Sequence, residues 1–541
     1  MIKNLFLKIG KKFILFKSRL ESLSAVSEPC NTIALERIDI FPRKRLYFRI
    51  SLIATFFIIY IMLFFCFPPN LILSGTTTNG GDMGAHNYIA KFFIEELFPH
   101  LRMTGWDMGW FAGMPMLTFY FPLPYFLMAL LYKFVGFNIS FKLVTILGSL
   151  ILPVSIYYFG KLFRFKYPFP EFAAIGSMAF LYMKSFTIYG GNFLGTFAGE
   201  FSYSISFGLI FIFIAALYRG IERQKFDWLF AVNCLLLACI VLTHLITLIA
   251  LIIIVPSLFF INRTWRCARY IIAVFAVGFF LSAFWSLPFV LLINWTPEMN
   301  WTNLKDIKKL FPLELIPALI LAVTGLFFST LKKDKRMVSV TWTVIIFMSL
   351  FFTWDSGRLY NARFLPFIFI FIYLLAAYGL SNLYWVFLTT YPFKKECIQV
   401  PVCRDSAARK IIKDSENSGT NINTENADES DKNEGDSDKK MLKNRLKHRI
   451  INFASFKNKF YRFAVFAFIP LVAFLGAGAI LAGNPLGPAW ARHNYTGFEN
   501  KDDWKLYDSL MKYLDSLPYG RVMFEFDKSI IQKFGTPRSF E

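Results

Sequence analysis

Residues 80–125 carry the side chains of this chain that are best suited to acid–base chemistry. The stretch follows the first long apolar segment, opens with Gly-Gly-Asp, and contains Asp82, His86 and Asp107 among aromatic residues and prolines. A carboxylate in a polar pocket beside a membrane can accept the proton of a hydroxyl group as that hydroxyl attacks a lipid-borne substrate. We therefore expect Asp82 to act as a general base. His86, one turn later on the same helical face, would position Asp82 or a substrate.

The same residues also have structural explanations that the sequence leaves open. Asp82 could be a turn residue after two glycines, and His86 could lie on the exposed side of its helix. Asp107 lies between Trp106 and Trp110 and could cap a helix. The expected catalytic set is nevertheless Asp82, His86 and Asp107.

Four ionisable residues later in the chain are further candidates for this site. Glu200 begins an apolar segment and could instead complement a helix dipole, while His244 could be a packed interfacial histidine. Two arginines lie close together in the segment WDSGRLYNARF; they suit phosphate recognition, although they could also reach toward lipid headgroups. We expect Arg358, Arg363 and His244 to bind a phosphate-bearing donor, and Glu200 to belong to the same site.

The composition predicts a polytopic membrane protein. The 541 residues are 56% hydrophobic and 17% charged, with apolar runs of about 18–25 residues, long enough to cross a bilayer as helices. The net charge of +22 comes from Lys and Arg in short loops between these runs, as on the cytoplasmic side of membrane proteins, so nucleic acid is not an expected partner. The cysteines contain no CxxC pair and predict neither a disulfide framework nor a zinc site.

The basic loops also predict the topology. Arg43, Lys44, Arg45 and Arg49 precede the first apolar run, which places the N-terminus in the cytoplasm and Asp82 outside. If the segment 116–134 crossed the membrane, four later basic loops would face outward. If it lies along the outer surface, all four face the cytoplasm. We choose the second arrangement, which collects the unusual polar residues on the outer face, where costly ionisable groups line cavities.

The expected fold is all-α, with about eleven transmembrane helices, juxtamembrane helices in the first external loop, and the start of a mixed external C-terminal domain. The chain could be a fragment, since GTPRSFE is no evident terminus. The expected spans are 48–68, 139–160, 170–189, 201–219, 228–244, 245–262, 270–294, 311–331, 338–353, 364–388 and 461–483. The expected parts are a basic amphipathic N-terminus at 1–47, a membrane module at 48–388 with its first external loop at 69–138, a disordered cytoplasmic linker at 389–460, the last span at 461–483, and an external segment at 484–541.

Several of these motifs resemble a known family. The external Gly-Asp, the histidine four residues on, the Trp-rich turn, and the segments GMPMLTFYFPLPYFLMALLYKFVG and FKLVTILGSLILPVSIYYFGKLF are similar to membrane proteins labelled 6-pyruvoyl-tetrahydropterin synthase-related. The likeness is most specific over residues 75–165, and it continues more loosely through the THL turn, the RLYNARF loop and the HNYTGFE segment. These proteins in turn resemble the GT-C superfamily of membrane glycosyltransferases, including the arabinofuranosyltransferases. The pterin-synthase activity itself is not expected, because the five histidines form no zinc-binding set.

The resemblance implies a sugar donor carried on a polyprenyl phosphate, an acceptor in a glycan, lipid or protein reached from the outer face of the cell membrane, and Asp82 as the base. A second acid is implied, with Asp107 and Glu200 as candidates. Single displacement would invert the anomeric centre. The aromatic residues expected to hold the sugar or the lipid are Trp106, Trp110, Tyr120 and Tyr125. No metal site is expected from ligand spacing, although a divalent cation between Asp82 and another acid is possible.

Two other function classes compete with an enzyme. A transporter or flippase of lipid-linked saccharides would show repeated halves, with charge near the middle of the bundle. A non-catalytic cell-surface assembly protein would use the polar residues only to support an external domain. Proximity of Asp82 to Glu200, Arg358 or Arg363 favours the enzyme, whereas a central two-sided pathway favours transport.

Overall fold

A computed structural model describes residues 44–110, 113–259, 261–298, 301–355, 359–390, 465–483 and 486–518, together with 520, 522 and 529. The predicted N-terminal amphipathic stretch and the predicted linker lie almost wholly outside the described residues, as does Arg358. The chain divides into two compact units, and the larger one contains the described residues from Arg49 to Asn382 and from Ile469 onward. In the smaller unit, Tyr384 Oη donates a hydrogen bond to the Val465 carbonyl (3.1 Å).

Eight helices among the described residues are long and apolar enough to cross a membrane, as expected for a multi-pass membrane protein. They are α3 (Lys44–Cys66), α7 (Phe137–Leu162), α10 (Phe201–Arg223), α14 (Trp265–Leu292), α16 (Ile316–Lys332), α17 (Lys335–Thr353), α18 (Leu365–Thr390) and the helix Val465–Gly483.

Shorter apolar helices occupy the remaining predicted span positions. They are α8 (Phe169–Leu181), α11 (Trp228–Thr243) and α12 (Leu245–Ile254), which α13 (Pro256–Phe259) extends. The predicted span 170–189 was too long, because α8 ends at Leu181. The Asn192 side chain donates to the Met183 carbonyl (2.8 Å) and the Phe186 carbonyl (3.0 Å), and Gly190 and Gly191 have positive φ, so this segment forms turns.

Small residues let the central helices approach closely. A Cβ added to Gly148 on α7 would lie 2.3 Å from the Ser204 backbone of α10. A Cβ added to Gly325 on α16 would lie 2.1 Å from the Leu375 carbonyl of α18. Only glycine permits backbones this close, which is how membrane helices gain packing contacts without a hydrophobic driving force between them.

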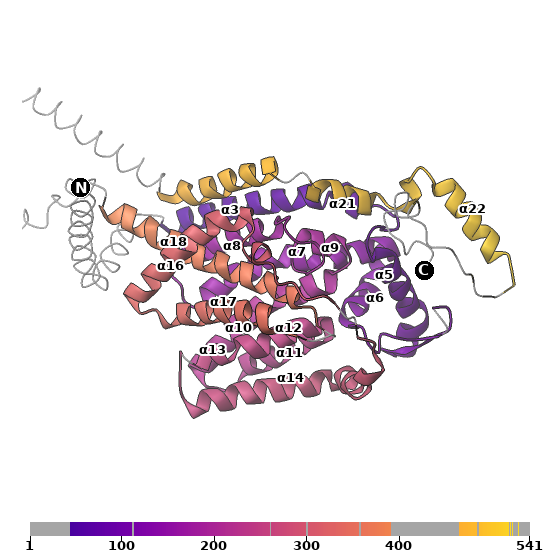
Figure 1. Cartoon of the computed structure of the whole chain (residues 1–541), viewed down its shortest axis with the longest axis horizontal. Helices are drawn as coiled ribbons and strands as arrows, with labels where there is room; N and C mark the ends of the chain where they lie inside the picture. The colour runs from indigo at the N-terminus through magenta and orange to yellow at the C-terminus, as the bar shows by residue number, and fades with distance from the viewer. Residues whose placement is uncertain are drawn as a thin grey trace, which may run out of the picture. The chain divides into compact units, whose positions relative to one another are not determined.

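The segment between α3 and α7 is built from short elements, within the loop predicted to contain juxtamembrane helices. In chain order they are α4 (Pro69–Ile72), α5 (Met83–Phe92), the π-helical turn η1 (Phe93–Leu97), η2 (Phe98–His100), strands β1 (Gly105–Asp107) and β2 (Met114–Met116), and α6 (Leu123–Val135). The two strands pair antiparallel, with Gly105 opposite Met116. With 13 residues, α6 is shorter than the roughly 20 needed to cross a bilayer. In the larger unit, α5, α6 and α9 (Phe193–Phe197) lie near one another (Figure 1).

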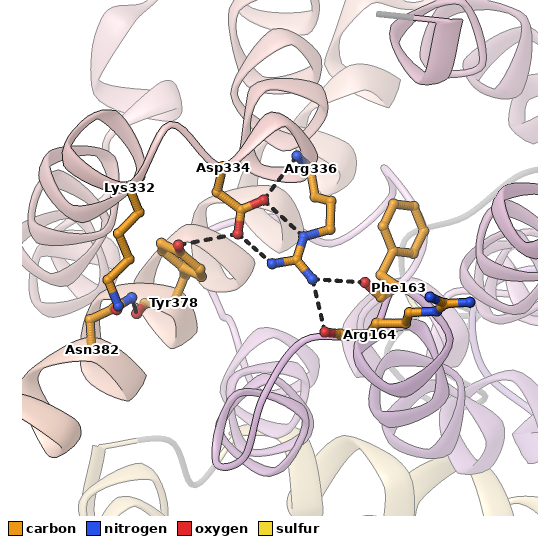
Figure 2. Close-up of polar contacts among 7 residues, drawn as sticks. All are labelled: Phe163, Arg164, Lys332, Asp334, Arg336, Tyr378 and Asn382. Atoms are coloured by element: carbon orange, nitrogen blue, oxygen red, sulfur yellow. Dashed lines mark hydrogen bonds and ion pairs between the residues drawn. The ribbon is translucent and has the colours of Figure 1, made fainter. Parts of the chain in front are cut away.

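At the other end of α7, a polar cluster joins the helix ends. Asp334 forms two hydrogen bonds with the Arg336 guanidinium (2.8 and 2.6 Å), and Arg336 Nη1 donates to the Phe163 and Arg164 carbonyls (3.0 and 2.8 Å) (Figure 2). Arg164 also pairs with Glu222 near the end of α10 (3.2 Å). The basic residues that follow α7, α10 and α16 therefore gather at one end, away from the Asp82 end.

The segment after the last apolar helix contains α21 (Leu486–Thr496), η7 (Phe498–Asn500) and α22 (Trp504–Asp515). The helix predicted in the sequence DDWKLYDSLMKYLDSL is present as α22, whereas the predicted strand at 521–526 lies almost wholly outside the described residues. Four short helices connect the long ones: η3 (Ile293–Trp295), α15 (Ile307–Leu310), η4 (Leu313–Leu315) and η5 (Asn361–Phe364).

Candidate active site

Asp82 lies against the turn that joins α9 to α10. Its backbone N–H donates to the Ala198 carbonyl (3.0 Å), and a Cβ added to Gly199 would lie 2.9 Å from the Asp82 Cβ. Gly199 has a φ of +113°, a conformation that glycine adopts without strain. Asp82 is the N-cap residue of α5, but its side chain makes no capping hydrogen bond, and the residue is exposed. Asp82 is therefore held against Gly199, the residue that precedes Glu200, and it is exposed to solvent.

Glu200 forms an ion pair with Arg363. Arg363 Nη2 donates to Glu200 Oε1, and the two side chains are 18% and 22% exposed, respectively. Glu200 precedes α10 and Arg363 lies in η5, so the pair joins two distant parts of the chain. Within the described residues, Arg363 Nη1 is buried and has no hydrogen-bond partner. The guanidinium therefore keeps a donor that an anionic ligand could use.

His244 lies at the break between α11 and α12 and is buried. Its ring is 4.5 Å from the Phe121 ring and 5.1 Å from the Tyr203 ring, centroid to centroid. Tyr203 Oη in turn donates to the Arg363 carbonyl (3.2 Å), so one tyrosine touches both residues. His244 Nδ1 has no hydrogen-bond partner among the described residues.

His86 packs into an aromatic cluster beside Asp82. Its Nδ1 is 2.8 Å from Tyr125 Oη, and its ring centroid is 5.3 Å from that of Tyr120 and 5.0 Å from that of Phe201. The alternative that His86 lies on the exposed side of its helix is wrong, since the side chain is buried. The hydrogen bond to Tyr125 fixes the orientation of the imidazole ring.

Tyr120 connects the aromatic cluster to the two carboxylates. Burial of its hydroxyl raises the pKa of Tyr120, and the charges of Glu200 and Asp82 raise it further. The charge of Arg363 lowers the pKa of Tyr120. Ring contacts and charge effects thus link six sequence-predicted residues, namely Asp82, His86, Glu200, Arg363, Tyr120 and Tyr125. His244 is joined to Arg363 through Tyr203.

Other predicted residues are not part of this cluster. Asp107 lies in β1, where its Oδ1 accepts a hydrogen bond from the Gly109 N–H (2.8 Å), so it closes a hairpin turn and does not cap a helix. Trp106 is 62% exposed, and Trp110 packs edge-on against Tyr88. Among the described contacts, those of Asp107, Trp106 and Trp110 are local to the hairpin and α5.

The described residues contain no group of three or more His, Cys, Asp or Glu side chains arranged to hold a metal ion. Two buried polar residues near the site were not among the predicted site residues. Lys142 on α7 and Asn494 on α21 are each 0% exposed. A lone lysine within an apolar run was a usable signal in the sequence, because ionisable groups at membrane depth are costly. Asn494 gave no comparable signal.

A family comparison matches half of the chain. Residues 117–386 match the model of the family described as 6-pyruvoyl-tetrahydropterin synthase related domain, membrane protein. The chain belongs to this family over that stretch. The family match includes Tyr120, Glu200, His244 and Arg363, and it begins after Asp82 and His86. The match includes the predicted likeness from residue 117 through the THL turn and the RLYNARF loop, and it ends before the HNYTGFE segment.

Other comparisons add little to the family assignment. No curated protein sequence matches the chain. Among solved structures, the chain is similar to ArnT from Cupriavidus metallidurans in the apo state, with 12% sequence identity and a TM-score of 0.43. The similarity covers 81% of this chain and 77% of ArnT. A likeness at this level does not assign an activity.

Proposed function

We propose that this protein is a membrane glycosyltransferase that transfers a sugar from a polyprenyl-phosphate donor to an acceptor hydroxyl, with Asp82 as the general base. The observation that carries this proposal is the position of Asp82 against Gly199, the residue that precedes Glu200 of the Glu200–Arg363 ion pair. An exposed carboxylate and a cation that keeps a buried, unused donor are the two main requirements of the reaction.

The reaction needs one base and one stabiliser of the leaving group. The acceptor oxygen attacks the anomeric carbon while the bond between that carbon and the phosphate oxygen breaks. The hydroxyl proton passes to the Asp82 carboxylate, which contributes a rate factor of roughly 10²–10⁴. The electron pair of the broken bond stays on the polyprenyl phosphate. A base opposite the leaving group gives inversion, by the geometric argument used for glycosidases.

Arg363 is the residue proposed to receive the departing phosphate. Glu200 holds one side of the guanidinium, which leaves Nη1 available for a phosphate oxygen. His244 Nδ1 likewise has no hydrogen-bond partner among the described residues, and Tyr203 contacts both His244 and the Arg363 backbone. Electrostatic stabilisation of this kind is strongest where water is excluded, as it is around these buried groups.

The proposed orientation places the site on the outer face of the cell membrane. Arg336, which pairs with Asp334, binds the carbonyls of Phe163 and Arg164, which directly follow α7 (Figure 2). Lys142, near the start of α7, instead contacts Ser74 and Thr76, which precede Asp82. Basic residues are enriched in cytoplasmic loops, so the end with Arg164 and Arg336 would face the cytoplasm. The acceptor would be part of a glycan, lipid or protein outside the cell, and the proposal needs no metal cofactor.

The test is the chemical state of the sugars in a strain that lacks the gene. The proposal predicts that polyprenyl-phosphate sugar accumulates, that the surface glycans lose the corresponding residue, and that the wild-type gene restores both. Purified protein in lipid nanodiscs should then transfer sugar from the accumulated lipid to glycan extracted from the deletion strain. Failure of the purified protein to transfer, with the donor trapped in the inner leaflet of cells, would show a transporter instead.

A further inference from the structure

Outside the catalytic cluster, many polar contacts involve the residues that precede Asp82 in the chain. They join residues 74–82, here called the Asp82 loop, to residues 493–499, here called the C-terminal clasp. We infer that the C-terminal clasp, together with Lys142, positions Asp82 for catalysis. This inference rests on the proposed function, and it assigns positioning roles to Asn494 and Lys142, which touch neither reacting group.

Backbone hydrogen bonds join the Asp82 loop to the C-terminal clasp. The Asn79 N–H donates to the Asn494 carbonyl (3.1 Å), and the Phe498 N–H donates to the Thr77 carbonyl (3.1 Å). The Thr77 N–H in turn donates to both carboxylate oxygens of Glu499 (2.9 Å each). These bonds run in both directions between the segments, so the C-terminal clasp fixes the path of the Asp82 loop.

The Asn494 side chain extends this contact to the turn on which Asp82 rests. Its Nδ2 donates to the Phe197 carbonyl at the end of α9 (2.8 Å). A Cβ added to Gly80 would lie 2.1 Å from Asn494 Oδ1, so the amide is packed tightly against the Gly-Gly-Asp turn. The Asn494 side chain therefore contacts two backbone segments, one at Gly80 and the other at Phe197. These two segments are hydrogen-bonded to each other through Asp82 and Ala198.

Lys142 secures the same junction from α7. Its ammonium group is buried, and its three donors lie within hydrogen-bond distance of five oxygens. These are the Leu71 carbonyl (3.0 Å), the Ser74 carbonyl and hydroxyl (3.1 and 2.9 Å) and the Thr76 hydroxyl (2.9 Å), and, in the C-terminal clasp, the Tyr495 carbonyl (3.4 Å). A buried ammonium with this many oxygen partners is stable only while the partners stay in place. Removing it would leave several buried oxygens without a donor, which favours separation of the segments.

The function of this arrangement is to hold the base. Asp82 is bonded to the α9–α10 turn through its own backbone N–H (3.0 Å). Loss of the contacts behind it would let the loop shift relative to Glu200 and Arg363. A displacement of about 1 Å in a catalytic group can lower a rate by roughly 100-fold. The segment after the last apolar helix is thus a part of the active site and not only the base of another domain.

The first experiment measures the contact without any assay of transfer. Hydrogen–deuterium exchange of the full chain in nanodiscs is compared for wild type, Asn494→Ala and Lys142→Met. Peptides covering 76–82 and 493–499 should exchange about tenfold faster in both variants, because their protected amides lose partners. Arg492→Ala and Lys161→Met are the controls, since Arg492 lies on α21 with Asn494 and Lys161 lies on α7 with Lys142. Both control side chains are exposed, so these variants should leave both peptides unchanged.

The second experiment measures the consequence for catalysis. Asn494→Ala should lower kcat by roughly 10- to 100-fold while the KM for the polyprenyl-phosphate donor stays within about twofold of wild type. If Asn494→Ala leaves the exchange of residues 76–82 unchanged, the contact does not hold the Asp82 loop in place. If exchange becomes faster but kcat is unaltered, Asn494 does not position Asp82 for catalysis. If Lys142→Met does not fold, Asn494→Ala still decides the question. Wild-type protein that transfers no sugar would refute the proposed function, whereas the exchange result would stand.

Discussion

The Arg363 guanidinium is paired with the Glu200 carboxylate, 163 residues earlier in the chain. This ion pair connects the α9–α10 turn, against which Asp82 lies, with η5, because Glu200 follows Gly199, whose added Cβ would meet the Asp82 Cβ. The pairing sets the orientation of the guanidinium and leaves Nη1 for a ligand. It therefore accounts for how residues from three parts of the sequence form one site.

Replacement of Arg363 by lysine should distinguish the effect of its positive charge from the effect of its hydrogen-bonding geometry. Arg363→Lys keeps a positive charge but loses the planar set of donors that holds Glu200 and a phosphate together. We expect the KM for the donor to rise by about tenfold or more, since hydrogen bonds to charged groups contribute roughly 1.5–3 kcal/mol. The KM for the acceptor should change little. Equal effects on donor and acceptor would argue against phosphate binding by Arg363.

Gly199 offers a test of the contact with Asp82. Gly199→Ala introduces a Cβ only 2.9 Å from the Asp82 Cβ and also strains a φ of +113°. Gly136→Ala is the matched control, because Gly136 has a φ of +79° with nothing within 4 Å of an added Cβ. Both variants should lose some stability from backbone strain, about 1–2 kcal/mol. Only Gly199→Ala should lose most of its transfer activity; similar activity in the two variants would show that this contact is unimportant.

The hydrogen bond between His86 and Tyr125 should affect the rate more than the binding of substrates. Tyr125→Phe removes the hydroxyl group 2.8 Å from His86 Nδ1 while keeping the aromatic ring. A hydrogen bond of this kind contributes about 0.5–1.5 kcal/mol, so we expect kcat to fall by up to roughly tenfold. Steady-state kinetics of the purified variant check this expectation. A wild-type kcat would show that the orientation of His86 does not matter to the reaction.

The Asp334–Arg336 cluster, which contacts the residues that follow α7, should contribute to stability and not to catalysis. Burial alone would raise the pKa of Asp334, but the hydrogen bonds and charge of Arg336 outweigh it and hold the pKa below its usual value (Figure 2). The stabilisation from Asp334 is therefore present above pH of about 4 and is lost as the pH falls through the lowered pKa of the folded state. Asp334→Asn should lower Tm at pH 7 and show a weaker loss of Tm on acidification. Parallel pH profiles of Tm for the two proteins would contradict this role.

The sequence predicted the fold class and most of the residues that the structure brings around Tyr120, but not the contacts that organise them. Apolar runs and basic loops are local features, so they located the helices without knowledge of the tertiary structure. The contact of Asp107 with the Gly109 N–H could not be predicted, because it depends on the hairpin formed by β1 and β2. The early end of α8 depends on Asn192, whose side chain holds two carbonyls that precede it.

The family resemblance extended to the HNYTGFE segment, which forms the C-terminal clasp, but the contacts of the clasp were beyond prediction from sequence. Asn494 and Asn79 are far apart in the chain, and neither residue's type signals that their backbones bond to each other. Lys142 was conspicuous as a charge within an apolar run, but its partners are carbonyl and hydroxyl oxygens that carry no pattern. Contacts made through backbone atoms depend little on residue type, so they are hard to predict from sequence.

The most direct measurement compares two carboxylates of the same segment. A deletion strain is complemented with Asp82→Asn or with Asp107→Asn, and its surface glycans and lipid-linked sugars are analysed at matched amounts of membrane-inserted protein. The account predicts that Asp82→Asn leaves the donor accumulated and the glycans incomplete, whereas Asp107→Asn restores both to near wild-type levels. Near-normal glycans with Asp82→Asn would show that Asp82 is not the base and would contradict the central claim.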